Sequence, residues 1–439
     1  MLKRRSLIKA LAATGFGGSA LATLSGCQVT MDGVKASGAS AAKGPARVIV
    51  VGGGFGGSSV AKYLKRFDSS INVTLIEPQK TYMTCPGSNW YLAGLVDANY
   101  ITQNYDALKT KHGVNVVHAT VTAVNAAGKK VTLSDGRVLD YDKLVVSPGI
   151  DFKYEAIQGY SADVIDQIPH AYKAGPQTEL LYKQIRAMPQ GGTFVICPPG
   201  NPFRCPPGPY ERVSMVADYF KKNNPTAKII VLDAKDKFSK QGLFVEGWQQ
   251  LYGDMIKWIP ASEGGKINRI DAKTKTVYTD FGDYKADVLN IIPPQKAGKL
   301  AFDAGLVNDK GWCPVNQQTF ESKIHPNVYV IGDSCVAGKM PKSGHSAASQ
   351  GKMCAASIVS ALQGKNAPTA KNVNTCYSLV GSDYGISVAA VYELKEGAIE
   401  GVKDAGGVSP KGADAAFRKM EANYAYGWYK SIAMDLWNS

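Results

Sequence analysis

Short apolar runs, separated by stretches with helical spacing, recur along the chain from residue 46 onward. Uninterrupted apolar runs bounded by turn residues are typical of buried parallel strands. The first run is followed by a glycine turn and by "FGGSSVAKYLKRF", which has the pattern of a helix. The runs lie at 46–51, 71–77, 141–149, 191–197, 227–233 and 327–335. This alternation predicts an α/β protein built on parallel sheets.

The glycine turn after the first run contains Gly52, Gly54 and Gly57, which fit the pattern G-x-G-x-x-G. The first glycine permits a tight turn, and the second lets the backbone approach a pyrophosphate at the helix N-terminus. The third allows close packing of the helix on the strand. The second apolar run ends at Glu77, whose carboxylate can accept hydrogen bonds from an adenosine ribose. Together these features predict a dinucleotide-binding site.

The last apolar run ends in Gly332-Asp333 and is similar to the second flavin motif of proteins with two dinucleotide folds. In that motif the aspartate binds the ribityl or pyrophosphate part of FAD, so we expect FAD rather than NAD here. A helix with small residues at its start follows at 340–364, and its N-terminus would stabilise negative charge on a reduced flavin. Lys342 either adds to that effect or is an ordinary surface lysine.

The chain after residue 45 divides into three predicted parts. They are a FAD-binding domain from 46–160 and 296–365, a second dinucleotide-like domain at 161–295, and a small α+β domain at 366–439. In the second domain the expected glycine loop is replaced by "CPPGNPFRCPPGPYER". Because proline has no N–H to donate to a phosphate, we expect no nicotinamide site there. The prediction is a glutathione-reductase-like pair of Rossmann-like domains whose electrons come from a donor other than NAD(P)H.

The N-terminus has the pattern of a targeting segment rather than of a folded element. Residues 1–26 begin with basic residues, including the pair Arg4-Arg5, and continue into a short apolar run that contains glycine. This resembles a twin-arginine export signal, which predicts a periplasmic protein exported in its folded state. "LSGC" also resembles a lipoprotein cleavage box with Cys27 as a lipid anchor, and ordinary cleavage is the alternative. Residues 27–45 are expected to form a flexible tether, and no later stretch has 18 consecutive apolar residues.

The formal net charge of +14 does not indicate nucleic-acid binding. Four of the positive charges lie in the export segment, and the others do not form basic runs with interleaved aromatic residues. The excess is either a solvated basic surface or a field that attracts small anions or an acidic partner.

The eight cysteines include no C-x-x-C pair, which excludes the commonest zinc pattern, the thioredoxin motif and a c-type haem attachment site. No metal site is predicted. Cys205 lies in the proline-rich loop where a nicotinamide would approach a flavin, and Cys376 lies in the C-terminal segment. If that segment covers the flavin, a disulfide between them is either a redox relay or a structural staple. Buried packing is the expected role of Cys197, Cys313, Cys335 and Cys354.

From about residue 46 the sequence resembles the flavoprotein subunit of flavocytochrome c sulfide dehydrogenase along nearly its whole length. The resemblance is carried by "VVGGGFGG", "TLIEPQKTYMTC", "PFRCPPGPYER", "FSKQG", "ADVLNIIPPQKAG", "GWCPV", "MPKSGHSA", "NTCYS" and "YGISVAA". The resemblance implies sulfide oxidation with FAD, and a haem carried by a separate c-type cytochrome subunit. This chain departs from common members in "CPGSN", where Pro86 follows the matching cysteine.

The resemblance also implies roles for individual residues. Cys85 would carry FAD through a thioether, and Cys205 and Cys376 would form the redox disulfide that HS⁻ attacks. Glu211 follows Cys205 closely in the sequence and is either a proton-handling group or a charge that stabilises a helix N-terminus.

Three alternatives remain at this stage. A sulfide:quinone oxidoreductase would need an amphipathic C-terminal membrane platform, whereas this tail is polar and aromatic. A non-catalytic, FAD-containing electron-transfer subunit would not need the two cysteines. A pyridine-nucleotide disulfide reductase is disfavoured because the second glycine loop and a C-x-x-C pair are both missing.

Overall fold

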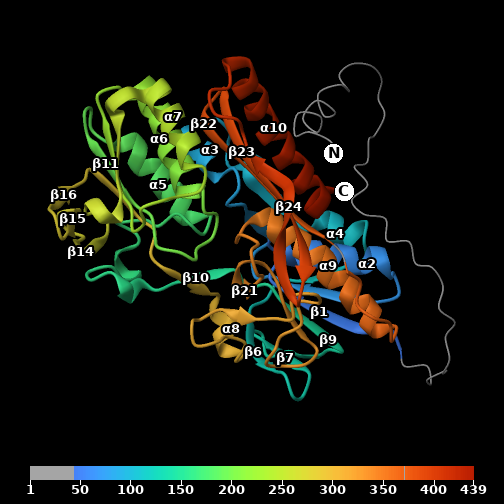
Figure 1. Cartoon of the computed structure of the whole chain (residues 1–439). Helices are drawn as coiled ribbons and strands as arrows, with labels where there is room; N and C mark the ends of the chain where they lie inside the picture. The colour runs from blue at the N-terminus through green and yellow to red at the C-terminus, as the bar shows by residue number, and fades with distance from the viewer. Residues whose placement is uncertain (1–43, 370) are drawn as a thin grey trace. The chain divides into compact units, whose positions relative to one another are not determined.

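The computed structural model describes residues 44–369 and 371–439. The predicted export signal, the lipid anchor at Cys27 and nearly all of the predicted tether lie outside the described residues. Residues 45–439 form one compact unit, which Figure 1 shows in ribbon form. No helix in the described part of the chain is long and apolar enough to cross a membrane.

A five-stranded parallel sheet has the strand order β20-β9-β1-β2-β5. Its strands are β1 (Arg47–Val51), β2 (Asn72–Ile76), β5 (Asn115–Val117), β9 (Lys143–Val146) and β20 (Val328–Val330). Helix α2 (Phe55–Phe67) packs closely on α9 (Gly344–Leu362). The helices are so close that a Cβ on Gly351 would lie only 2.7 Å from the Cβ of Ser59. The parts of the chain before and after the second domain therefore contribute strands to one Rossmann-like sheet.

The second parallel sheet has the order β13-β12-β11-β17. It consists of β11 (Thr193–Cys197), β12 (Lys228–Leu232), β13 (Ile256–Ile259) and β17 (Val288–Ile291), with helices α5 (Pro176–Ala187), α6 (Gly208–Asn223) and α7 (Gln241–Tyr252). The two chain crossings between the sheets pair with each other as antiparallel strands β10 (Ile150–Phe152) and β18 (Gln295–Ala297). The predicted two-domain α/β fold is confirmed.

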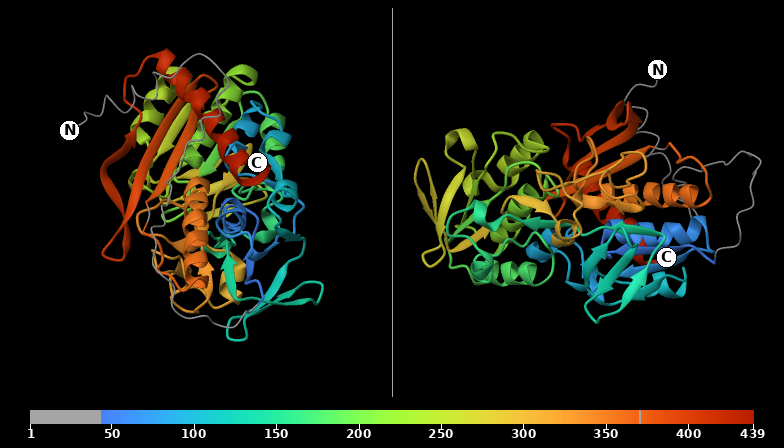
Figure 2. Two further views of the ribbon diagram at one scale, coloured as in Figure 1. Left: turned by 90° about the vertical axis from the view of Figure 1, so that its right-hand side faces the viewer. Right: turned by 90° about the horizontal axis from the view of Figure 1, so that it is seen from below.

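The C-terminal part is an antiparallel sheet of β22 (Asn372–Gly381), β23 (Tyr384–Lys395) and β24 (Ala398–Val408), followed by helix α10 (Ala415–Ala433). Figures 1 and 2 show this part, in red, lying against both dinucleotide-binding halves. At its far end the Trp437 ring packs 5.0 Å from the Phe55 ring and stacks 5.7 Å from the Tyr82 ring. The predicted α+β C-terminal domain is confirmed.

Short elements complete the fold. One two-stranded sheet consists of β3 (Thr81–Met83) and β4 (Thr102–Asn104). A three-stranded sheet consists of β6 (Val121–Asn125), β7 (Lys130–Leu133) and β8 (Val138–Asp140). Another consists of β14 (Ile267–Asp271), β15 (Thr276–Thr279) and β16 (Asp283–Lys285). The pair β19 (Cys313–Pro314) and β21 (Cys335–Val336) and helices α3 (Ser88–Ala93), α4 (Asp106–Thr110) and α8 (Lys299–Asp303) are the others.

Candidate functional site

A cavity of about 250 Å³ lies where the two dinucleotide-binding halves meet the C-terminal sheet. The loops that follow β1, β9 and β20 contribute to its wall, and the carboxyl ends of parallel strands are where such sheets bind ligands. Eight of the predicted site residues line it: Gly52, Gly54, Glu77, Cys85, Cys205, Glu211, Asp333 and Cys376. Gly57 and Lys342 are not among its lining residues.

The glycine turn has the close backbone approaches that its sequence predicts. Gly52 has φ +97°, and a Cβ there would lie 2.4 Å from the Ser147 carbonyl oxygen. A Cβ on Gly57 would lie 1.7 Å from the Gly52 oxygen, so the helix can approach the strand only without a side chain. The N-cap Gly54 has no side-chain cap and the first turn of α2 has no acidic residue, so its N–H groups suit a phosphate.

Glu77 and Asp333 present carboxylates at two places on this wall. Glu77 Oε2 accepts the Gly53 N–H at 2.8 Å, which holds the carboxylate at the glycine turn. Asp333 Oδ2 is paired with the Arg204 Nε at 2.6 Å. Asp333 Oδ1 is buried and has no hydrogen-bond partner in the described part of the chain. An acceptor with a free lone pair in this position fits a ribityl hydroxyl of FAD.

Lys342 points away from the cavity. Its ammonium donates to the carbonyl oxygens of Asp333 at 2.7 Å and Cys335 at 2.9 Å. It also lies 3.9 Å from the centre of the Trp312 ring. In this position Lys342 holds the turn that presents Asp333, and its predicted contact with the flavin stays a prediction.

Cys85 follows strand β3 and has a partly exposed sulfur in the cavity. Arg204 Nη1 donates to Cys85 Sγ at 3.6 Å, and the thiol donates to the Tyr172 carbonyl oxygen at the same distance. Arg204 Nη1 also donates to that Tyr172 oxygen at 3.2 Å. The sulfur that was predicted to hold FAD therefore has a guanidinium as its neighbour.

Cys205 and Cys376 line the same cavity from opposite parts of the fold, and both are free thiols in the structure. Cys205 has φ 53°, a left-handed backbone conformation that is uncommon for a residue with a side chain and is often found at functional sites. Burial raises the pKa of the Cys205 thiol well above its usual value, and the neighbouring Cys376 and Glu211 add to this effect. Burial also raises the pKa of Cys376, although Lys240 and Asn374 oppose that effect.

Glu211 lies in the first turn of helix α6 and is buried with three donors around its carboxylate. Asn89 Nδ2 donates at 2.8 Å, the Trp90 indole at 3.1 Å and the Leu379 N–H at 3.0 Å. Burial raises the pKa of Glu211, and these three hydrogen bonds act in the opposite direction. A carboxyl group with a raised pKa next to two thiols can take up and release protons.

Lys240 immediately precedes α7 and is a buried cation beside the strand that carries Cys376. Its Nζ donates to Ser378 Oγ at 2.8 Å and to the Cys376 carbonyl oxygen at 3.3 Å. Burial lowers the pKa of Lys240 to about 8, while Cys376, Glu211 and Cys205 favour its charged form. A cation in this position stabilises negative charge on the two sulfurs.

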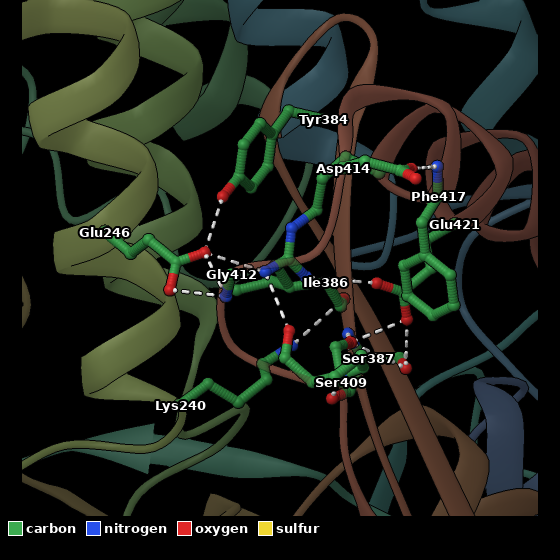
Figure 3. Close-up of polar contacts among 12 residues, drawn as sticks. Lys240, Glu246, Tyr384, Ile386, Ser387, Ser409, Gly412, Asp414, Phe417 and Glu421 are labelled. Carbon is green, nitrogen blue, oxygen red and sulfur yellow. Dashed lines mark hydrogen bonds and ion pairs between the residues drawn. The ribbon is translucent and has the colours of Figure 1, made fainter. Parts of the chain in front are cut away.

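A buried ionic network fixes the C-terminal sheet and helix near Lys240 (Figure 3). Arg418 of α10 pairs with Glu246 of α7 at 2.9 Å and with Glu421 at 3.4 Å. Glu421 in turn accepts the hydroxyl groups of Ser387 and Ser409, at 2.7 Å and 2.6 Å. The network therefore links the C-terminal domain to the second domain.

Arg204, Lys240 and Tyr172 are site residues that the sequence analysis did not single out. Arg204 and Lys240 lie within "PFRCPPGPYER" and "FSKQG", two of the stretches that carried the family resemblance. The position of Arg204 directly before Cys205 could have identified it as a site residue from the sequence. Nothing local marks Lys240 or Tyr172. Within the described residues, no group of three or more His, Cys, Asp or Glu could hold a metal ion.

Comparisons with known protein families match three parts of the chain. Residues 178–293 match the model "Sulfide dehydrogenase [flavocytochrome c] flavoprotein chain, central", and 368–437 match "Flavocytochrome c sulphide dehydrogenase, flavin-binding". Residues 46–178 match "Pyridine nucleotide-disulphide oxidoreductase".

Two relatives show how far the similarity extends. The sulfide dehydrogenase [flavocytochrome c] flavoprotein chain of Chlorobaculum thiosulfatiphilum is 63% identical over 46 residues, which are 10% of this chain and 96% of that sequence. The mitochondrial sulfide:quinone oxidoreductase of Mus musculus is 23% identical over 306 residues. That alignment spans 66% of each protein, just under two thirds of the relative.

Solved structures share the fold at low sequence identity. The sulfide:quinone oxidoreductase of Aquifex aeolicus has a TM-score of 0.67 at 16% identity, over 89% of this chain and 92% of that one. The putidaredoxin reductase–putidaredoxin complex has a TM-score of 0.64 at 18% identity, over 90% of this chain and 99% of that one. These likenesses show the two-dinucleotide-domain fold.

Proposed function

The chain belongs to the family of flavocytochrome c sulfide dehydrogenase flavoprotein chains, and we therefore propose that it oxidises sulfide with FAD and passes the electrons to a separate c-type cytochrome. Membership of the family makes it a flavin-dependent oxidoreductase of the sulfide-oxidising group. Covalent attachment of FAD at Cys85, the redox role of the two cavity cysteines and the cytochrome acceptor are the proposed part.

The observation that carries the proposal is that Cys205 and Cys376 line one cavity together with the glycine turn and Asp333. Cys205 lies in the loop before α6 and Cys376 lies in β22, whereas the glycine turn and Asp333 belong to the FAD-binding domain. A dithiol in the same cavity as a flavin allows two-electron exchange between them.

The sulfur chemistry follows from thiol–disulfide exchange. HS⁻ attacks the oxidised Cys205–Cys376 pair, its S–S bond breaks, and the products are a persulfide on one cysteine and a thiolate on the other. Loss of the sulfur atom and of one proton re-forms the disulfide and releases two electrons. FAD, when bound, accepts such a pair of electrons and gives them up singly.

Two further residues of the chain support this reaction. The Glu211 carboxylate is positioned near both thiols to accept the proton that HS⁻ or the persulfide gives up. The Lys240 ammonium favours the thiolate of Cys376, because it opposes the effect of burial on that thiol.

The proposed acceptor and location rest on the sequence. No C-x-x-C-H occurs in the chain, so the haem belongs to a different subunit. The Arg4-Arg5 segment supports export to the periplasm by the twin-arginine route, and Cys27 would anchor the protein if it is lipidated.

The test compares acceptors for the flavin-containing full chain. With sulfide as donor, we expect soluble cytochrome c to be reduced faster than a water-soluble ubiquinone analogue. Cys205→Ser and Cys376→Ser should each abolish reduction of the flavin by sulfide but leave its reduction by dithionite intact. Cys354→Ala, at a buried position in α9 away from the cavity, is the matched control and should retain the activity. Faster quinone reduction would assign the chain to the quinone-reducing group, and sulfide reduction in the Cys205→Ser protein would refute the disulfide mechanism.

A further inference from the structure

The guanidinium of Arg204 contacts two residues of the candidate flavin site, Asp333 and Cys85. Its Nε pairs with Asp333 Oδ2 at 2.6 Å, and its Nη1 donates to Cys85 Sγ at 3.6 Å. The side chain is 15% exposed and lines the cavity. Arg204 therefore places a fixed positive charge beside the sulfur that is proposed to hold FAD.

The surroundings hold Arg204 in this position. Its backbone N–H donates to Gln295 Oε1 at 2.7 Å, and its Nη1 also donates to the Tyr172 carbonyl oxygen at 3.2 Å. Burial acts against the charge on Arg204, but Asp333 and Cys85 raise its pKa, so the guanidinium stays protonated. A cation fixed by four separate contacts keeps its charge aimed at the sulfur.

The chemistry of cysteine makes this arrangement informative. The nucleophile is the thiolate, and a neighbouring arginine increases the fraction of thiolate. A charge-assisted hydrogen bond from a guanidinium is stronger to a thiolate than to a neutral thiol. A cysteine that serves only as packing has no need of a buried arginine at its sulfur.

We propose that Arg204 promotes the covalent attachment of FAD by stabilising the negative charge that develops on the Cys85 sulfur as it bonds to the flavin. The proposal rests on the proposed function, in which Cys85 carries FAD. Arg204 touches the reacting sulfur and so takes part in the attachment reaction, which is separate from the oxidation of sulfide.

Attachment of FAD to Cys85 breaks two bonds, forms one bond and releases two electrons. A bond forms between Cys85 Sγ and the 8α carbon. One C–H bond of the 8α methyl group and the S–H bond of the thiol break, and each gives up one proton. Two electrons remain on the ring, and they pass to dioxygen or to the one-electron acceptor of the enzyme. Arg204 is unchanged at the end, and its role is to stabilise negative charge on the sulfur as the bond forms.

Titratable and charged groups from several elements lie near Cys85. They are Tyr82 on β3, Tyr172 and Arg212 beside the cavity, Cys205 in the proline-rich loop, and Arg204 with its partner Asp333. Burial raises the pKa of Tyr82, Tyr172 and Cys205, so these three groups stay neutral near neutral pH. Arg204 is the cation among them that donates to the Cys85 sulfur.

The experiment follows flavin attachment in the full chain, made as apoprotein under riboflavin limitation and then mixed with FAD in air. Covalent flavin is measured as fluorescence of the denatured chain on a gel, and total bound FAD is measured before denaturation. The variants are Arg204→Gln, Arg204→Lys and Cys85→Ser. Arg137→Gln removes the exposed arginine of another Arg–Asp pair and is the matched control.

We expect Arg204→Gln to slow attachment about tenfold to a hundredfold at neutral pH, as for the loss of a charge-assisted hydrogen bond. Arg204→Lys should fall between Arg204→Gln and the unsubstituted chain, and Arg137→Gln should match the latter.

The measured rates distinguish a role of Arg204 in attachment from a structural effect of the substitution. An equal attachment rate in Arg204→Gln, with total FAD binding retained, refutes the role of Arg204. A rate in Arg204→Lys as slow as that in Arg204→Gln, or a proportional loss of total FAD, also refutes it, because either result shows a structural effect. If the unsubstituted chain itself releases all its flavin on denaturation, the covalent attachment at Cys85 in the proposed function is wrong.

Discussion

The Glu211 carboxylate accepts a hydrogen bond from the backbone N–H of Leu379 at 3.0 Å. Glu211 lies in α6 just after the Cys205 loop, and Leu379 lies in β22 just after Cys376. One hydrogen bond therefore connects the two elements that carry the proposed redox cysteines.

Replacing Glu211 with glutamine should slow the reduction of the flavin by sulfide about a hundredfold, as for the loss of a general base. Burial raises the pKa of Glu211, so the rate in the unsubstituted protein should fall as the pH drops through that pKa and the carboxylate is protonated. Stopped-flow reduction by sulfide at a series of pH values tests this, and the variant should lack that acidic limb. An identical pH profile in the variant would show that Glu211 is not the proton acceptor.

The same group has a predictable effect on stability. Because the pKa of Glu211 is raised in the folded state, its favourable contribution is present at pH values below the unfolded pKa. That contribution is lost as the pH rises through the folded pKa. Thermal unfolding at several pH values should show a smaller loss of stability toward neutral pH in Glu211→Gln than in the unsubstituted chain.

Lys240→Met should lower the second-order rate constant for sulfide about tenfold, because Cys205 and Cys376 lose a nearby buried cation whose charge favours the approach of HS⁻. Burial lowers the pKa of Lys240 to about 8, so in the unsubstituted protein the rate should fall as the pH rises through about 8 and the ammonium is deprotonated. The groups that face it are Cys376, Glu211, Cys205 and Glu421.

Lys240→Arg is the matched control for this charge. Arginine stays protonated at all pH values of interest, so this variant should keep the rate and lose the alkaline limb. Photoreduction of the flavin, which does not involve sulfide, should be unchanged in both variants. A Lys240→Met protein with the same alkaline limb would assign that limb to a different group.

Arg418→Met should destabilise the protein by about 3–5 kcal/mol, because it leaves the buried carboxylate of Glu421 and the partly buried carboxylate of Glu246 without their cation. Lys419→Met is the matched control at the next position of α10. Lys419 is 61% exposed and pairs with the exposed Asp383 at 3.5 Å, so its loss should cost less than about 1 kcal/mol. Urea unfolding measures both, and equal losses would contradict a role for the Arg418 network in holding the C-terminal domain.

Gly57→Ala should abolish or strongly weaken FAD binding, because its Cβ would lie 1.7 Å from the Gly52 oxygen and force α2 away from β1. Gly427→Ala is the control within a helix. No atom lies within 4 Å of a Cβ built at Gly427 of α10, so this substitution should stabilise the protein by about 0.5–1 kcal/mol. Flavin content after purification and the thermal midpoint report the two results. Full FAD content in Gly57→Ala would contradict the close packing of helix and strand.

The amino-acid sequence was sufficient for those features whose physical cause is local. The apolar runs and the glycine spacing predicted the parallel strands and the turn after β1, because buried strands and tight turns each constrain neighbouring residues. The missing glycine loop in the second domain was visible for the same reason. Strand β24 was not predicted, because most of its side chains are exposed and it contains several glycines, so it has no apolar pattern.

The tertiary structure alone decided which distant charges meet the cysteines. Arg204 reaches Cys85, Lys240 reaches the backbone of Cys376, and Lys342 turns to the Asp333 carbonyl instead of the cavity. The contacts of Arg204 and Lys240 join residues from separate domains, so their geometry depends on how the domains pack on one another. Hydrogen bonds and buried charges act over a few ångströms in space, whereas patterns in the sequence report only on neighbours along the chain.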